Sequence, residues 1–205
     1  MKIYKLGEDV LRQKCTPVDK AQINDEFRQL LAEMFQAMKK AGGVGLAAPQ
    51  VGITQRFFVA VADDDVKRVF VNPEITWTSP EVEEFDEGCL SLPGLSENIV
   101  RPVRVSVRAL DENGKPFFLE DVDGLLARII QHENDHLDGI LYIDRGSEEF
   151  KAKAEEHFRK KAEKERKKAA QKEAKRQSTD AKIAAKIAAK AAAKVAPTVA
   201  AKKNS

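Results

Sequence analysis

The sequence of 205 residues has little that could cross-link it or hold it in a membrane. Two cysteines are too few for a framework of disulfide bonds, which leaves each thiol for packing, metal binding or catalysis. No run approaches the roughly 20 apolar residues of a membrane-spanning helix. The first residues lead directly into acidic ones and lack the apolar core of a signal peptide. We therefore expect a cytoplasmic protein that does not enter a membrane.

Charge is distributed unevenly along the chain. Residues 1–150 carry 17 Lys and Arg against 27 Asp and Glu, a net charge of −10, whereas residues 151–205 carry 18 against 6, a net charge of +12. After residue 146 the composition shifts to Lys, Glu and Ala, which favours an exposed helix. We predict a folded domain over 1–146, a charged helix over 147–177 and a Lys/Ala-rich, low-complexity tail over 178–205. The basic tail either improves solubility or binds a polyanion.

Hydrophobic periodicity predicts two helices and a group of strands in the first domain. Apolar residues recur at three- and four-residue steps over 25–40 and again over 124–137. Between the two helices the pattern is mostly strand-like, with β-rich or alternating runs at 57–61, 69–71, 103–108 and 116–119. Strands followed by one central helix indicate an α+β fold. We expect antiparallel or mixed sheets packed around the second helix, followed by the C-terminal helix and tail.

The second predicted helix contains Gln131-His132-Glu133-Asn134-Asp135-His136. Side chains four residues apart on a helix lie about 6 Å from each other on one face, so His132 and His136 can bind one metal ion. Glu133 lies about 100° round the helix, close enough to reach a metal-bound water without being a ligand. A metal ion and a carboxylate that act on one water are typical of metal-dependent hydrolases. The plain alternative is a polar helix face on which two of only three histidines fall at this spacing.

A third ligand is expected upstream, in Glu87-Gly88-Cys89-Leu90-Ser91. Cys89 would supply a thiolate, Gly88 would let backbone approach closely, and Glu87 could support the ligands from behind. A lone cysteine in a β-rich region is otherwise a small buried apolar residue. Farther upstream, the glycine-rich segment 43–52 can run close to a ligand, and Gln50 offers an N–H donor of the kind that stabilises an oxyanion.

The segments 43–50, 87–91 and 131–136 resemble, in order and separation, the three signature motifs of peptide deformylases. The similarity covers about residues 1–145, and no motif position departs from the family pattern. The resemblance implies a hydrolase that removes the N-formyl group from formyl-methionine at the N-terminus of newly synthesised polypeptides and releases formate. It also implies one divalent metal ion, Fe(II) in this family, with zinc, nickel or cobalt accepted.

The resemblance also implies roles for individual residues. Cys89 and the two histidines would bind the metal ion. Glu133 would take the proton of the water and pass it to the leaving amine, while the Gln50 side chain and the Leu90 backbone amide hold the oxyanion. The remaining implied roles are substrate contacts from Val44, Gly45 and Gly88, a methionine pocket from Phe85, Leu125 and Ile129, and support of the site by Glu87 and Arg101.

Other functions stay open on the residues alone. A zincin-type metallopeptidase shares the His-Glu-x-x-His helix, but its third ligand lies downstream. A ribosome- or nucleic-acid-binding protein with a structural metal needs no carboxylate beside its ligands. A cysteine hydrolase that used Cys89 and His132 would leave His136 and Glu133 unexplained. For the leading interpretation we expect a monomer whose partners are formylmethionyl nascent peptides and, through the basic C-terminal region, the ribosome and its RNA.

Overall fold

The computed structural model describes residues 1–195, with side chains described as far as residue 191. It contains two compact units, of which the first spans Met1–Phe158 and the second begins at Arg159. Among the described residues, no helix has the length and apolar character needed to cross a membrane.

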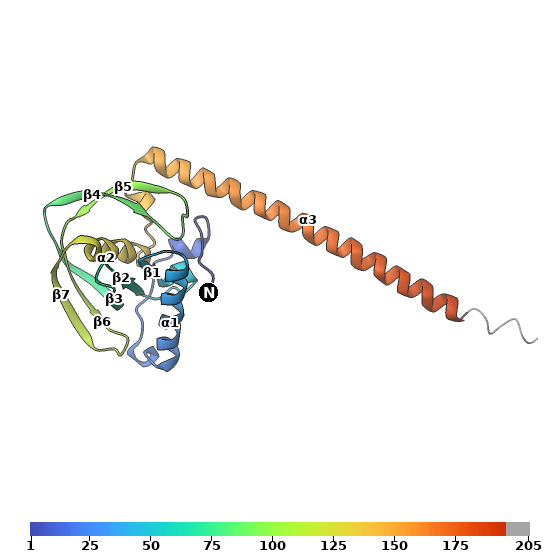
Figure 1. Ribbon diagram of the computed structural model, residues 1–205, viewed down its shortest axis with the longest axis horizontal. Helices are drawn as coiled ribbons and strands as arrows, with labels where there is room; N and C mark the ends of the chain where they lie inside the picture. Colours follow the sequence, from blue (N-terminus) through green and yellow to red (C-terminus); the bar gives the residue numbers. More distant parts are fainter. Residues whose placement is uncertain (196–205) are drawn as a thin grey trace, which may run out of the picture. The chain divides into compact units, whose positions relative to one another are not determined.

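The first unit is built on a five-stranded sheet in which every neighbouring pair is antiparallel (Figure 1). Its strands, in spatial order, are β1 (Gly45–Ala47), β2 (Phe57–Val61), β3 (Lys67–Thr78), β6 (Val105–Leu110) and β7 (Pro116–Val122). The strand-like runs at 103–108 and 116–119 are confirmed as β6 and β7, which pair as an antiparallel hairpin. Strand β3 extends to Thr78, farther than the short run at 69–71 indicated, because its second half is largely exposed and lacks a continuous apolar pattern.

A separate antiparallel pair is formed by β4 (Val82–Gly88) and β5 (Ser96–Pro102). Glu87 faces Glu97, and Glu83 faces Arg101 across this pair. The inward face therefore carries the side chains of Glu87, Ile99 and Arg101, which are all buried. This hairpin brings charged groups to the interior, where they need partners from another element.

Helix α1 (Asp25–Lys40) starts where predicted, because the Asn24 side chain accepts a hydrogen bond from the Phe27 backbone amide at 3.0 Å. Its apolar stripe is buried against β1 and β2. The residues of this core include Phe27, Leu31, Met34, Met38, Leu46, Phe57 and Val59.

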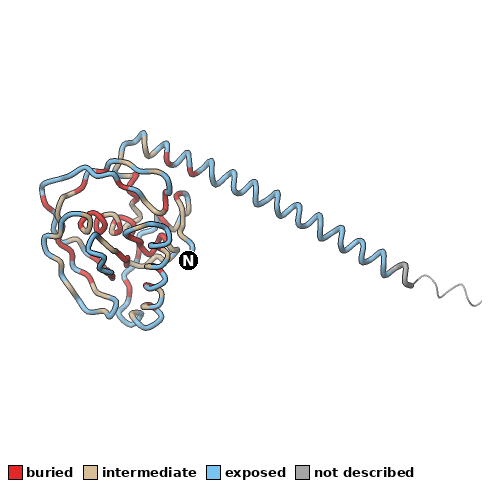
Figure 2. The backbone as a smooth tube through the Cα atoms, viewed as in Figure 1, coloured by how far each residue is buried: buried red, intermediate tan, exposed pale blue. Residues whose placement is uncertain are grey.

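Helix α2 (Gly124–Leu137) lies between the large sheet and the β4–β5 hairpin (Figure 1). One side of it packs against β1 and β2, and its other side faces the hairpin, so it is buried nearly all round (Figure 2). Polar residues at 131, 133, 135 and 136 are buried together with the apolar ones. The predicted α+β fold with sheets packed around this helix is confirmed.

Within residues 1–195, the connecting segments contain four short 3₁₀ helices. They are η1 (Asp9–Arg12), η2 (Lys20–Gln22), η3 (Ala48–Val51) and η4 (Tyr142–Asp144). Helix α3 (Glu148–Val195) begins in the first unit, where Ala154 and Phe158 are buried against Leu141 and Tyr142. From residue 159 to 191 every side chain is exposed. The helix is continuous across residue 177, and the predicted division of the chain at 146 and 177 stays a prediction.

We expect Gly139→Ala to destabilise the first unit more than Gly42→Ala. Each glycine follows the end of a helix with nearly the same left-handed φ, +73° and +74°, so the backbone cost of alanine is the same, about 1 kcal/mol. A Cβ at 139 would lie 2.6 Å from the Arg12 carbonyl oxygen, whereas nothing lies within 4 Å of one at 42. Urea unfolding should give a loss of about 3 kcal/mol for Gly139→Ala. Equal losses would contradict this contact.

Candidate metal centre

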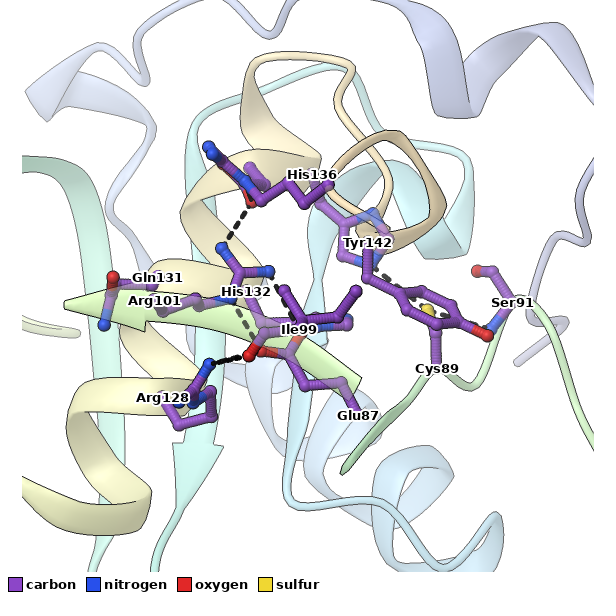
Figure 3. A network of polar contacts seen from close by, with 12 residues as sticks. Glu87, Cys89, Ser91, Ile99, Arg101, Arg128, Gln131, His132, His136 and Tyr142 are labelled. Atoms are coloured by element: carbon purple, nitrogen blue, oxygen red, sulfur yellow. Dashed lines mark hydrogen bonds and ion pairs between the residues drawn. The ribbon is translucent and has the colours of Figure 1, made fainter. Parts of the chain in front are cut away.

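Cys89 lies just after the end of β4, and His132 and His136 occupy one face of α2. One potential ligand atom from each of the three side chains lies within 4.8 Å of the others. Cys89 Sγ is 3.3 Å from His136 Nε2 (Figure 3). A thiolate and two imidazoles at this separation form the donor set of a tetrahedral site with one open position. The i, i+4 spacing therefore brings the two histidines together as predicted.

Glu87 orients His132 from behind. Its Oε2 is 2.9 Å from His132 Nδ1, which leaves the other ring nitrogen to point toward the metal position. The Glu87 side chain also accepts hydrogen bonds from Arg101 at 2.6 and 3.0 Å. Burial disfavours the charged carboxylate, but the bonds to His132 and Arg101 outweigh it and lower the pKa of Glu87 to about 2. Glu87 is therefore an anion held at the back of the site.

The charges around the ligands favour a cation at the metal position. Burial lowers the pKa of His132, but its hydrogen bonds with Cys89 and Glu87 outweigh burial and raise the pKa to about 10. Burial and the positive charge of His132 hold the pKa of His136 well below its ordinary value. His136 is therefore a neutral imidazole, whereas the groups around His132 favour a positive charge. A divalent metal ion fits both properties.

Glu133 is 4% exposed and lies against the backbone of β1. A Cβ at Gly45 would come within 2.3 Å of Glu133 Oε1, so only glycine lets β1 pass this close. Glu133 Oε2 has no hydrogen-bond partner among the described residues. Burial raises the pKa of Glu133 to about 7. A carboxylate of this kind can exchange a proton with a small molecule in the cavity.

Gln50 joins η3 to the loop that contains Cys89. Its Oε1 accepts from the Ala47 backbone amide at 2.8 Å, which fixes the side-chain amide. Its Nε2 donates to Cys89 Sγ at 3.4 Å and to Ser91 Oγ at 3.2 Å. The N–H donor predicted from the sequence therefore faces the ligand set.

Arg128 belongs to the site but was missed by the sequence analysis. It lies one turn before His132 on α2 and donates to Glu87 Oε1 at 3.0 Å. It also donates to the carbonyl group of Ile99 on β5 at 3.0 Å (Figure 3) and to that of Glu83 on β4 at 3.1 Å. A single charged residue in the apolar run at 125–130 was the signal that could have identified it.

Arg101 links Glu87 to a second buried carboxylate. It donates to Asp135 at 2.7 Å, and Arg145 donates to the two oxygens of Asp135 at 2.5 and 2.6 Å. The structure thus brings Glu87 and Arg101 together in the arrangement that was expected. It adds Asp135 and Arg145, to which the sequence analysis assigned no role.

A cavity of about 460 Å³ opens beside the metal position. It is lined by residues from all three motifs together with the loop after Cys89. The predicted site residues that line it are Val44, Gly45, Gln50, Phe85, Glu87, Gly88, Cys89, Leu90, Leu125, Ile129, His132 and Glu133. His136 and Arg101 lie outside the lining. Phe85 is 45% exposed, so it can cover a ligand only at the mouth of the cavity.

Residues 1–152 match the family model described as polypeptide deformylase. The chain is 50% identical over 149 residues to a peptide deformylase of Treponema pallidum, which covers 73% of this chain and 90% of the relative. It is 48% identical over 145 residues to a peptide deformylase of Fusobacterium nucleatum, covering 70% and 82%.

Solved structures that this chain resembles are also peptide deformylases. A peptide deformylase from Synechococcus elongatus in complex with actinonin is 46% identical, with a TM-score of 0.68, over 72% of this chain and 79% of that chain. Peptide deformylase 1B of Arabidopsis thaliana in complex with an inhibitor is 35% identical, with a TM-score of 0.74, over 80% and 93%.

Arg128→Met should cost about 3 kcal/mol in the free energy of unfolding, because it removes one partner of a buried ion pair together with its hydrogen bonds to two backbone carbonyls. Arg104→Met is the matched control. Arg104 also pairs with a carboxylate, that of Asp121. It lies over the Trp77 ring as Arg128 lies over the Phe85 ring, but its side chain is 39% exposed. We expect its replacement to cost at most about 1 kcal/mol. Thermal or urea unfolding measures both, and similar losses would show that burial of Arg128 has no special weight.

Proposed function

The chain belongs to the polypeptide deformylase family, and we propose that Glu133 is the base of the family's reaction in this enzyme. The enzyme is a hydrolase that removes the N-formyl group from formyl-methionine at the N-terminus of newly synthesised polypeptides and releases formate. The observation that supports Glu133 is its unpartnered, buried Oε2 beside the three ligand side chains. Two other carboxylates of the described residues line the cavity: Glu87 is held by two arginines and His132, and Asp86 is exposed.

In this proposal Cys89, His132 and His136 hold one divalent metal ion, which supplies a Lewis acid that activates water and polarises the formyl group. Glu133 takes a proton from the attacking water as its oxygen adds to the formyl carbon. The former carbonyl oxygen becomes an oxyanion, and the Gln50 side-chain amide and Leu90 backbone amide donate to it. When the C–N bond breaks, Glu133 returns the proton to the leaving amine.

The substrate is proposed to bind as an extended strand. Strand β1 is an edge strand of the large sheet, so the backbone of Gly45 and of Val44 just before it can pair with the substrate. Gly88 lines the cavity from the end of β4 and can contribute to the same pairing. Leu125 and Ile129 of α2 form the apolar wall for the methionine side chain, with Phe85 at the mouth.

We propose Fe(II) as the physiological ion and the cytoplasm as the compartment. A thiolate with two imidazoles suits iron as well as zinc. Iron bound by a thiolate is sensitive to oxygen, so elemental analysis of protein purified without oxygen is the direct measurement. If zinc is the main ion under those conditions, the assignment of iron is contradicted, but the proposed reaction is not.

The test of the proposed base is formate release from formyl-Met-Ala-Ser. We expect Glu133→Gln to lower turnover about 10³-fold while the protein keeps its metal, because the amide fills the same space and cannot accept the proton. Glu120→Gln makes the same chemical change on the exposed part of β7 and should leave turnover unchanged. Substantial turnover by metal-loaded Glu133→Gln would exclude Glu133 as the base.

We further propose that the exposed part of α3 contacts ribosomal RNA and that the catalytic domain, 1–146, acts without the tail. Residues 159–191 hold 13 Lys and Arg and 4 Asp and Glu, and all of their side chains are exposed. Such a surface is suited to phosphate contacts. The nascent substrate leaves the ribosome, so a contact there would raise its local concentration.

Removal of residues 178–205 should change turnover of the short formyl-peptide less than about twofold, because the described residues that line the cavity all lie between 41 and 133. Binding to ribosomes should weaken and depend less steeply on salt. A variant with Lys182, Lys186 and Lys190 all changed to Gln keeps a good helix former at each position and should show the same loss of binding. Unchanged binding in both variants would refute an RNA contact through residues 178–191, and a large loss of turnover after truncation would show that the domain boundary is wrong.

A further inference from the structure

The N-terminal segment Tyr4–Leu6 crosses the two loops that hold the proposed oxyanion donors. The Tyr4 backbone amide donates to the Gln50 carbonyl at 2.8 Å. The Leu6 backbone amide donates to the Ser91 carbonyl at 3.1 Å. Three consecutive residues therefore connect the η3 loop to the loop after Cys89, from a part of the chain that none of the three motifs includes.

Lys5, between them, makes the contact nearest to the metal ligands. Its Nζ donates to the Leu90 carbonyl at 2.7 Å, across 85 positions in the sequence. Its own backbone amide donates to Glu8 at 2.6 Å, which fixes the segment from which the side chain extends. The lysine is half-buried, so water only partly screens its charge.

The Leu90–Ser91 peptide group lies directly between this cation and the thiol of Cys89. Its carbonyl accepts from Lys5 Nζ at 2.7 Å, and its N–H donates to Cys89 Sγ at 3.4 Å. A positive charge at the oxygen end of a peptide group polarises it and makes its N–H a stronger donor. The ammonium of Lys5 thus acts on the sulfur through one peptide group.

We propose that Lys5 is a positioning residue that tunes Cys89 as a metal ligand and fixes Leu90 for oxyanion binding. A hydrogen bond to a thiolate withdraws electron density from the sulfur, so the ligand donates less to the metal ion, which stays a stronger Lewis acid. The same contact restrains Leu90, whose own amide is the proposed oxyanion donor. The inference rests on the proposed function for the roles of Cys89 and Leu90.

Lys2 provides a matched control in the same segment. It pairs with Glu8 at 2.6 Å with its side chain 64% exposed, and its Nζ lies 4.1 Å from the centre of the Tyr4 ring. Among the described residues, Lys2 has no hydrogen bond or ion pair with either loop of the site. Lys2→Met removes the same charge from the N-terminal segment as Lys5→Met does, so the two variants separate a general effect of charge or of segment packing from the specific contact to Leu90.

The experiment uses the full-length protein loaded with Co(II), which reports on the sulfur through its thiolate-to-metal charge-transfer absorption. Lys5→Met should move this band to longer wavelength. Without the ammonium group the Ser91 N–H is a weaker hydrogen-bond donor to the thiolate, so the sulfur transfers an electron to the metal ion at lower energy. Turnover of formyl-Met-Ala-Ser should fall about tenfold with KM changed less than twofold. Lys5→Arg, which keeps a cation able to reach the carbonyl, should restore the band and most of the turnover, and Lys2→Met should match the wild type.

An unchanged band in a folded, cobalt-loaded Lys5→Met protein would overturn the inference, as would shifts of equal size in Lys2→Met. A variant that loses only thermal stability, with the wild-type band and turnover, would reduce Lys5 to a structural contact and overturn it equally. If Lys5→Met does not fold, Lys5→Gln removes the charge with a polar side chain and is read in the same way. Failure of the wild-type protein to release formate would instead refute the proposed function. The absorption band of the wild type does not test that function, so the two failures can be told apart.

Discussion

The buried carboxylate of Glu87 is the constraint on which the rest of the site depends. It binds His132, Arg101 and Arg128 at the same time, and these three residues come from α2 and β5. A buried ion pair adds little to stability when it is compared with apolar packing of the same volume, but removal of one partner is costly. Its effect here is geometric, because the anion fixes the ring of a metal ligand and attaches the β4–β5 hairpin to the helix that carries both histidines. Strand β4 of this hairpin leads directly into Cys89, so the third ligand depends on the same carboxylate.

Close approach of backbone explains why the first motif is rich in glycine. A Cβ at Gly45 would meet Glu133 at 2.3 Å, and one at Gly43 would meet the Leu90 side chain at 2.6 Å. The first motif is therefore small because the second and third motifs lie against it. Three segments that are far apart in the sequence form one packed object, and the composition of each is set by contact with the others. The contact with Glu133 allows no adjustment, because the carboxylate is buried and cannot move away, whereas Leu90 can rotate its flexible end.

Local patterns in the sequence predicted the parts of this structure that depend on neighbours along the chain. The helices at 25–40 and 124–137 and the i, i+4 histidines follow from a period of 3.6 residues. The partners of Arg128 and Lys5 do not, because their contacts span 29 to 85 positions and leave no periodic trace. Glu87 and Arg101 were paired only through the family resemblance, since 14 residues separate them and their register across β4 and β5 is a property of the fold. The catalytic roles of Gln50, Leu90 and Glu133 stay predictions, because placement beside the ligands is not a measurement of chemistry.

The two buried carboxylates of the site have opposite electrostatic surroundings, and this difference divides their tasks. Burial alone would raise the pKa of both. At Glu87 the hydrogen bonds and charges of His132 and Arg101 outweigh burial and lower its pKa to about 2, whereas burial dominates at Glu133 and raises its pKa to about 7. A carboxylate that never takes up a proton is suited to hold a ligand ring, and one whose charged form is only weakly favoured is suited to move a proton. The arginines that could have fixed the charge of Glu133 lie behind Glu87, on the side of α2 away from β1. The same helix can therefore present a permanent anion to His132 and a proton acceptor to the cavity, although His132 and Glu133 are adjacent in the sequence.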